Sequence, residues 1–220
     1  MRYFCYCQLI EFCLIENEYR LVKLLISHQQ KTDCRYYYAC KDAKKAVIYV
    51  GGIGGGWDSP ARELYPKLSR KVISNGISSP RIHYRHPTYL DECVKDVIAG
   101  IKFLENNRIQ SVGLVGHSLG GAVVIKAAAV STNIVKTVVT LATQSYGAVE
   151  PVSELGQKGC SILLIHGTDD DVLSPTCSSY IYSKASNPKH MILFEGARHG
   201  LDEAADEMYR TIYQWLLDHL

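Results

Sequence analysis

Three short segments of this sequence place reactive side chains directly after apolar runs. The first is GHSLGG at residues 116–121, which carries Ser118. The second, HGTDDDVLSP, begins at His166 and holds three consecutive aspartates, and the third, GARHG, carries His199. A serine, an acid and a histidine are the side chains of nucleophilic catalysis, in which the histidine removes the serine proton and the acid orients the histidine. The order Ser, Asp, His, with each residue after its own strand, is typical of that chemistry on an α/β sheet.

The segment around Ser118 has the spacing Gly-x-Ser-x-Gly. This spacing predicts a strained turn between a strand and a helix, which lifts the serine hydroxyl clear of the backbone. Gly116 and Gly120 are needed there because the strand and the helix approach each other closely. The alternative is an ordinary strand-to-helix turn with a capping serine. The apolar runs on both sides favour the exposed nucleophile.

A second glycine-rich segment, GGIGGGWDSP, starts at Gly51 after another apolar run and has five glycines in its first six positions. Gly51 and Gly56 have the spacing of a phosphate-binding loop. However, Trp57 and Asp58 stand where that loop requires lysine and serine or threonine. Trp57 also occupies the place of the third glycine of a dinucleotide-binding motif. A nucleotide-binding enzyme is therefore a weak alternative.

An oxyanion hole explains this glycine-rich segment better. Its backbone amides would supply one donor, and the amide of Leu119, the residue after the serine, would supply the other. We predict Ile53 as the donor from the loop. Gly52 and Gly54 are its alternatives.

The acid and the base follow the last two predicted strands. Charge alone does not distinguish the three aspartates, one of which is expected to cap the following helix. His199 lies between Gly196 and Gly200 and precedes a helix, so it is the predicted general base. Most of the remaining histidines are predicted to be bystanders: His117 is expected to point away from the serine, and His166 lies within or at the end of a strand.

Alternating strand and helix patterns position these segments. Short apolar runs, mostly β-branched, predict strands at 46–50, 81–84, 111–116, 135–142, 161–166 and 191–196. Helical spacing or capping signals predict helices at 89–107, 119–130, 174–185 and 202–220, and one that starts with Ser59 as its cap and Pro60 at its first position. This alternation predicts an α/β fold with a doubly wound, mostly parallel sheet and helices on both faces. Residues 18–26 and 34–41 are predicted to form an antiparallel hairpin at one edge.

The composition is that of a globular protein. Of the 220 residues, 47% are hydrophobic and 21% charged, and the net charge of +2 is scattered along the chain. No nucleic-acid or membrane partner is therefore expected. We predict a single domain over 18–220, preceded by an extension at 1–17. That extension lacks a cleavage signal, and the eight cysteines match no zinc spacing, so thiols in a cytoplasmic protein are expected.

These motifs resemble those of the α/β-hydrolase superfamily over residues 18–220. The resemblance implies Ser118 as nucleophile, His199 as base and Asp170 as acid, since the family segment His-Gly-x-x-Asp counts from His166 to Asp170. Asp171 is the nearest rival. It also implies catalysis without a cofactor or a metal ion.

The chain is similar to the compact branch that includes dienelactone hydrolases and small carboxylesterases. Dienelactone hydrolases use a cysteine nucleophile where this chain has Ser118, and Gly51-Gly52 replaces the usual His-Gly of the oxyanion loop. Fewer than 20 residues separate the predicted strands on either side of 143–160, which leaves no room for a helical lid.

The function predicted from the sequence is hydrolysis of a small carboxylic ester through an acyl-enzyme. A thioesterase, peptidase or acyltransferase on the same triad is an alternative, since a fold does not fix the acyl acceptor. A non-catalytic small-ligand-binding homologue is the alternative from another class. Trp57, Arg85, His86 and Tyr146 are further candidates for lining a pocket.

Overall fold

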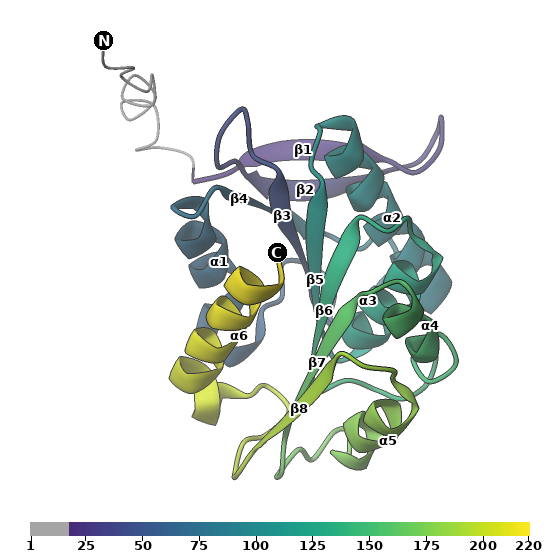
Figure 1. The fold of residues 1–220 in the computed structure, drawn as a ribbon, viewed down its shortest axis with the longest axis vertical. Coiled ribbons are helices and arrows are strands. Elements are labelled where there is room, and N and C mark those ends of the chain that lie inside the picture. Colours follow the sequence, from purple (N-terminus) through teal and green to yellow (C-terminus); the bar gives the residue numbers. More distant parts are fainter. Residues whose placement is uncertain (1–17) are drawn as a thin grey trace.

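The computed structural model describes residues 18–220, which form an eight-stranded α/β sheet with helices on both faces (Figure 1). The strand order is β1-β2-β4-β3-β5-β6-β7-β8. The first two strands pair antiparallel at one edge, β2 also runs antiparallel to β4, and all other neighbours are parallel. The strands are β1 Arg20–Leu25, β2 Lys31–Tyr37, β3 Lys45–Val50, β4 Ile77–Ile82, β5 Ser111–His117, β6 Val135–Leu141, β7 Ser161–Gly167 and β8 Lys189–Phe194.

The helices divide between the two faces of this sheet (Figure 1). One face carries α1 and α6, and the other carries α2, α3, α4 and α5. Each face has its own buried apolar cluster. No helix in the described part of the chain combines the length and the apolar character that a membrane span requires. The helices are α1 Pro60–Ile73, α2 Leu90–Asn106, α3 Leu119–Val130, α4 Val152–Gln157, α5 Thr176–Lys184 and α6 Ala205–His219, preceded by a short 3₁₀ turn at Asp202–Ala204.

The predicted fold class and the edge hairpin are confirmed. One predicted strand is wrong, because 81–84 overlaps only the end of β4 Ile77–Ile82. Ser78, Ser79 and Pro80 form the centre of this strand, and they carry none of the apolar or β-branched pattern that marks strands in a sequence. Pairing with β2 and β3 on either side determines β4 instead.

The start of α1 also differs from the prediction. Ala61, Arg62 and Glu63 are left-handed, with φ of 49°, 51° and 66°. Regular helix therefore begins only after them, and the Ser59 hydroxyl accepts a hydrogen bond from the Tyr65 amide at 2.9 Å. Left-handed geometry costs a residue with a side chain about 1–2 kcal/mol. Three such residues in a row need compensating contacts, which they find next to the candidate site.

The sequence also predicts that the cysteines are free thiols and that residues 1–17 form an extension before the domain. Between residues 18 and 220, five cysteines are present as free thiols: Cys34, Cys40, Cys93, Cys160 and Cys177. The predicted extension at 1–17, with the other three cysteines, lies outside the described residues.

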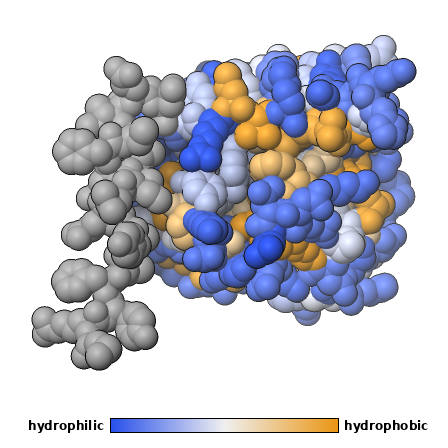
Figure 2. Space-filling model, turned by 90° about the horizontal axis from the view of Figure 1, so that it is seen from above, coloured by the Kyte–Doolittle hydropathy of each residue, from blue (hydrophilic) through white to orange (hydrophobic). Residues whose placement is uncertain are grey.

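Seen from above, the molecule shows mainly hydrophilic side chains with smaller hydrophobic areas between them (Figure 2).

An ion pair anchors α2 to the loop after β4. The Arg85 Nε lies 2.5 Å from Asp96 Oδ1, and the Arg85 amide donates to Asp96 Oδ2 at 3.0 Å. The Asp96 side chain is fully buried, whereas that of Glu92, the second partner of Arg85, is partly exposed. Burial raises the pKa of Asp96, although hydrogen bonds from Arg85 act in the opposite direction. Arg85 therefore has a structural role, because it joins the loop after β4 to α2.

We expect Asp96→Ala to lower the free energy of unfolding by about 3–5 kcal/mol, because it leaves the Arg85 guanidinium buried without its main partner. Urea denaturation followed by circular dichroism measures this. Glu92→Ala is the matched control, and it should have a much smaller effect because that pair is partly solvated. Equal losses in the two variants would contradict this account.

Candidate active site

Ser118 lies in the turn between β5 and α3, at the carboxyl end of a central strand. Its φ of 55° and ψ of −120° are a conformation that residues with side chains rarely adopt. The Ser118 amide donates to the Leu141 carbonyl at 2.8 Å, and the Thr143 hydroxyl donates to the Ser118 carbonyl at 3.0 Å. Contacts from the last residue of β6 and from the loop after it thus fix the strained backbone on both sides of the side chain.

Three glycines allow this turn to form. A Cβ on Gly116 would overlap the carbonyl oxygen of Gly120, and one on Gly120 would overlap the carbonyl oxygen of Gly51. A Cβ on Gly121 would overlap the Thr143 hydroxyl. The close approach that the Gly-x-Ser-x-Gly spacing predicted is therefore present. It joins four segments: β5, α3, the glycine-rich loop after β3 and the loop after β6.

The structure brings His199 and Asp170 together from the loops after β8 and β7. His199 Nδ1 lies 2.8 Å from Asp170 Oδ2, and the Asp170 side chain is fully buried. Asp170 Oδ1 accepts hydrogen bonds from the amides of Leu173 at 2.8 Å and Val172 at 2.9 Å. Asp171, the rival acid, is exposed. The geometry thus favours Asp170.

Opposing effects set the ionisation of Asp170. Burial by itself raises its pKa, but the hydrogen bonds from the Leu173 amide, from His199 and from the Val172 amide together outweigh that effect. The pKa of Asp170 therefore lies below its ordinary value, and the group is a carboxylate at neutral pH. A carboxylate on Nδ1 of an imidazole leaves the proton-free Nε2 as the base.

His117, predicted to be a bystander that points away, instead contacts the His199 loop. Its Nε2 lies 2.9 Å from the His199 carbonyl oxygen, and the two rings lie 4.8 Å apart between centroids. Because a carbonyl only accepts, Nε2 carries the proton of His117. Burial lowers the pKa of His117 and keeps it neutral. The residue before Ser118 thus holds the loop of His199 beside the serine, although no hydrogen bond joins Ser118 to His199 in the described structure.

The left-handed turn at the start of α1 braces the same loop from its other side. The Ala61 amide donates to the Gly200 carbonyl at 2.7 Å, and the Arg62 amide donates to Asp202 Oδ1 at 2.9 Å. The left-handed geometry points both amides toward these acceptors, and the two hydrogen bonds offset part of the conformational strain of Ala61 and Arg62. The His199 loop is therefore fixed from two elements that are distant in sequence.

The two predicted oxyanion donors lie at different places. Leu119 is buried directly after Ser118, whereas Ile53 is 60% exposed. Within the glycine-rich loop, Gly52 lies against the serine, since a Cβ on it would be 3.2 Å from the Cβ of Ser118. The backbone of Gly52 therefore stays an alternative to that of Ile53. Gly54 has open space around its Cα.

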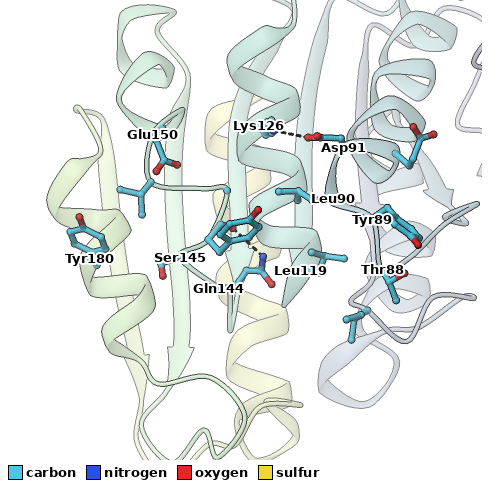
Figure 3. A pocket seen from close by; sticks show the side chains of 15 residues that line it. Thr88, Tyr89, Leu90, Asp91, Leu119, Lys126, Gln144, Ser145, Glu150 and Tyr180 are labelled. Carbon is cyan, nitrogen blue, oxygen red and sulfur yellow. Dashed lines mark hydrogen bonds and ion pairs between the residues drawn. The ribbon is translucent and has the colours of Figure 1, made fainter.

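A cleft of about 1040 Å³ adjoins the turn (Figure 3). Tyr146, one of the four candidates for lining a pocket, is among its walls, and two other lining residues, Lys126 and Asp91, form an ion pair at 2.6 Å. The other three candidates are not in its lining, and the ring of Trp57 instead covers the Arg35 guanidinium at 4.3 Å. The lining consists of Ile53, Thr88, Tyr89, Leu90, Asp91, Glu92, Leu119, Lys126, Gln144, Ser145, Tyr146, Gly147, Val149, Glu150 and Tyr180.

His166, which the sequence predicts to be a bystander at a strand end, instead contacts the acid. His166 Nε2 lies 3.0 Å from Asp170 Oδ2, and its Nδ1 lies 2.7 Å from the Ser178 hydroxyl. The four-residue separation of a histidine and an aspartate across a strand end was the available signal.

The sequence profile of the alpha/beta hydrolase family matches residues 61–202, which is more than half of the chain. This chain belongs to the alpha/beta hydrolase family. It is also similar to the kynurenine formamidase of Meyerozyma guilliermondii, with 32% identity over 91 residues. That match covers 37% of this chain and only 32% of the formamidase.

Solved structures of other alpha/beta hydrolases share the fold. The esterase Est1E from Butyrivibrio proteoclasticus superposes with a TM-score of 0.75 at 13% identity, over 90% of this chain and 98% of its own. A dienelactone hydrolase from Anabaena variabilis reaches a TM-score of 0.77 at 16% identity, over 92% of this chain and 98% of its own. At these identities the likeness concerns the fold, and the chemistry rests on the residues above.

We expect Gly116→Ala to destabilise this alpha/beta hydrolase by about 1–3 kcal/mol or more, because its Cβ would meet backbone that the turn cannot move. Thermal and urea unfolding measure the loss. Gly54→Ala is the matched control from the glycine-rich loop, where a Cβ meets open space. Similar stability of both variants would show that the close approach is not a constraint.

Proposed function

We propose that this alpha/beta hydrolase is a serine hydrolase that cleaves a small carboxylic ester, with Ser118 as nucleophile, His199 as base and Asp170 as acid. The observation that carries the proposal is the contact of 2.8 Å between His199 Nδ1 and the buried carboxylate of Asp170, held next to a serine with strained backbone. This is the arrangement in which an imidazole activates a hydroxyl.

The reaction begins when Ser118 Oγ attacks the carbonyl carbon of the ester and His199 Nε2 takes the hydroxyl proton. Asp170 stabilises the imidazolium through Nδ1 without taking its proton. The tetrahedral intermediate collapses as His199 returns the proton to the leaving alcohol, and the acyl group stays on Ser118. Water then attacks the acyl-enzyme by the same steps in reverse, which releases the acid and the free serine.

The negative oxygen of the tetrahedral intermediate needs donors that are in place beforehand. The amide of Leu119 at the start of α3 supplies one, and the glycine-rich loop supplies the other through Ile53 or Gly52. The amino end of α3 adds its positive dipole. Losing one such donor typically slows catalysis about 10²- to 10³-fold.

The cleft receives the part of the substrate that extends from the reacting carbonyl. Ile53 and Leu119 lie at its Ser118 end, and Lys126 lies seven residues further along α3, or about 10 Å at the rise of a helix. A compact acyl or alcohol group of that length fits the cleft. Because residues 18–220 contain no lid domain, this class of substrate reaches the serine directly.

Cleavage of a formamide is the second candidate, favoured by the likeness to a kynurenine formamidase. The same three residues would cleave an amide, provided that His199 protonates the departing nitrogen. A cytoplasmic location, and the lack of cofactor, nucleic-acid and membrane partners, stay predictions from the sequence.

Wild-type protein should form a covalent adduct with a fluorophosphonate probe, and peptide mass spectrometry should locate it on Ser118. Ser118→Ala should abolish labelling, and His199→Ala should slow it about 10³-fold or more, because the hydroxyl then lacks its base. His28→Ala, at an exposed histidine in the β1–β2 turn, is the control and should label normally. A folded wild type without an adduct would favour a non-catalytic ligand-binding protein.

A matched pair of substrates separates the two candidates. We expect phenyl formate to be cleaved with a kcat/KM at least ~10²-fold above that of formanilide, since the ester has the better leaving group and needs less help from a general acid. Steady-state rates with wild type and Ser118→Ala measure this. Comparable values for the two substrates would select the formamidase alternative.

A further inference from the structure

Asp170 contacts two imidazoles through one oxygen. Its Oδ2 lies 2.8 Å from His199 Nδ1 and 3.0 Å from His166 Nε2. The side chains of His166 and Asp170 are both fully buried. The proposed mechanism uses only the His199 contact, so the contact with His166 is unexplained by it.

The surroundings of His166 fix which of its nitrogens carries the proton. Its Nε2 faces two acceptors, Asp170 Oδ2 and the Leu173 carbonyl at 3.0 Å. Nε2 is therefore the protonated nitrogen, and Nδ1 accepts a hydrogen bond from the buried Ser178 hydroxyl at 2.7 Å. Burial lowers the pKa of His166, so the ring is neutral. Ser178 on α5 thus fixes a neutral donor against the carboxylate.

We propose that His166 is a positioning residue for the acid: its Nε2–H, oriented by Ser178, holds Asp170 Oδ2 toward His199 and shares the negative charge of that oxygen. This inference rests on the proposed function. The two backbone amides hold only Oδ1, so they fix one end of the carboxylate and leave its rotation open. The hydrogen bond from His166 restricts that rotation, because it is made to Oδ2, the same oxygen that contacts His199 Nδ1.

Sharing this charge has a measurable consequence. A donor on Oδ2 weakens the attraction between Asp170 and the His199 imidazolium. Withdrawal of that donor should strengthen the attraction and move the acid limb of the rate profile to higher pH. Other titratable groups nearby are His117 from the turn, Asp58 from the glycine-rich loop, and the charged residues of the two loops, Asp169, Asp171, Arg198, Asp202 and Glu203. All of them are unchanged in the variants used here.

Two amide substitutions at His166 separate the contact of its Nε2 with Asp170 from the contact of its Nδ1 with Ser178. His166→Gln places an amide N–H near the site of Nε2 and so keeps a donor for Asp170. His166→Asn reaches only as far as Nδ1, and so keeps a partner for Ser178 while it withdraws the donor from Asp170. Both remove a buried aromatic ring, so their losses of stability should be similar.

The experiment measures the second-order rate of fluorophosphonate labelling of Ser118 from pH 5 to 9 in the full chain, together with urea unfolding. We expect His166→Asn to label about 10- to 100-fold more slowly, the effect of one hydrogen bond to a charged group, and to show an acid limb at higher pH. His166→Gln should stay within about threefold of wild type with its acid limb in place. His190→Asn, at an exposed ring on β8, is the control for the substitution itself.

Each other outcome overturns a specific claim. Unchanged labelling and an unchanged acid limb in His166→Asn would show that His166 is only a packed core histidine. Equal losses in the Asn and Gln variants, in step with their stabilities, would show the same. Failure of the wild type to label would instead overturn the proposed function, and the role of His166 with it.

Discussion

The close approach of two backbones is the constraint on which the rest of this structure depends. β5 runs into α3 with so little space that the carbonyl of Gly120 lies where a side chain on Gly116 would begin. That approach forces the backbone of Ser118 into a strained conformation at the carboxyl edge of the sheet. It also brings the glycine-rich loop, whose Gly51 carbonyl lies against Gly120, within reach of the serine.

Around this turn, the positions of the loops are fixed by hydrogen bonds between polar groups. The loops after β7 and β8 contain little regular structure, yet each carries a side chain that must be held in place. Asp170 is held by two amides and two imidazoles, the backbone of the His199 loop by His117 and the Ala61 amide, and the Asp202 side chain after it by the Arg62 amide. Loops fixed in this way carry side chains beyond the edge of the sheet and still hold them in defined positions.

Much of this arrangement could be predicted from the sequence. Apolar strands and Gly-x-Ser-x-Gly are local patterns, so they predict the sheet, the turn and the order of the candidate residues. β4 could not be found, since Ser78, Ser79 and Pro80 become a strand only through their neighbours. The partner of His117, and the partners of His166 other than Asp170, could likewise not be predicted. Their contacts are made by backbone carbonyls, and by Ser178, a residue that no motif marks.

Apart from Ile53 and the α3 residues Leu119 and Lys126, the cleft in Figure 3 is built from other parts of the chain than the loops that fix the acid and the histidine of the candidate triad. Its walls come from the start of α2, from α5 and from residues 144–150, where Gly147 packs against Leu90. The acid and the histidine are fixed instead by the β7 and β8 loops and the start of α1. Replacements in those walls, away from Ile53 and Leu119, can therefore change the shape of the cleft while the acid and the histidine keep their contacts.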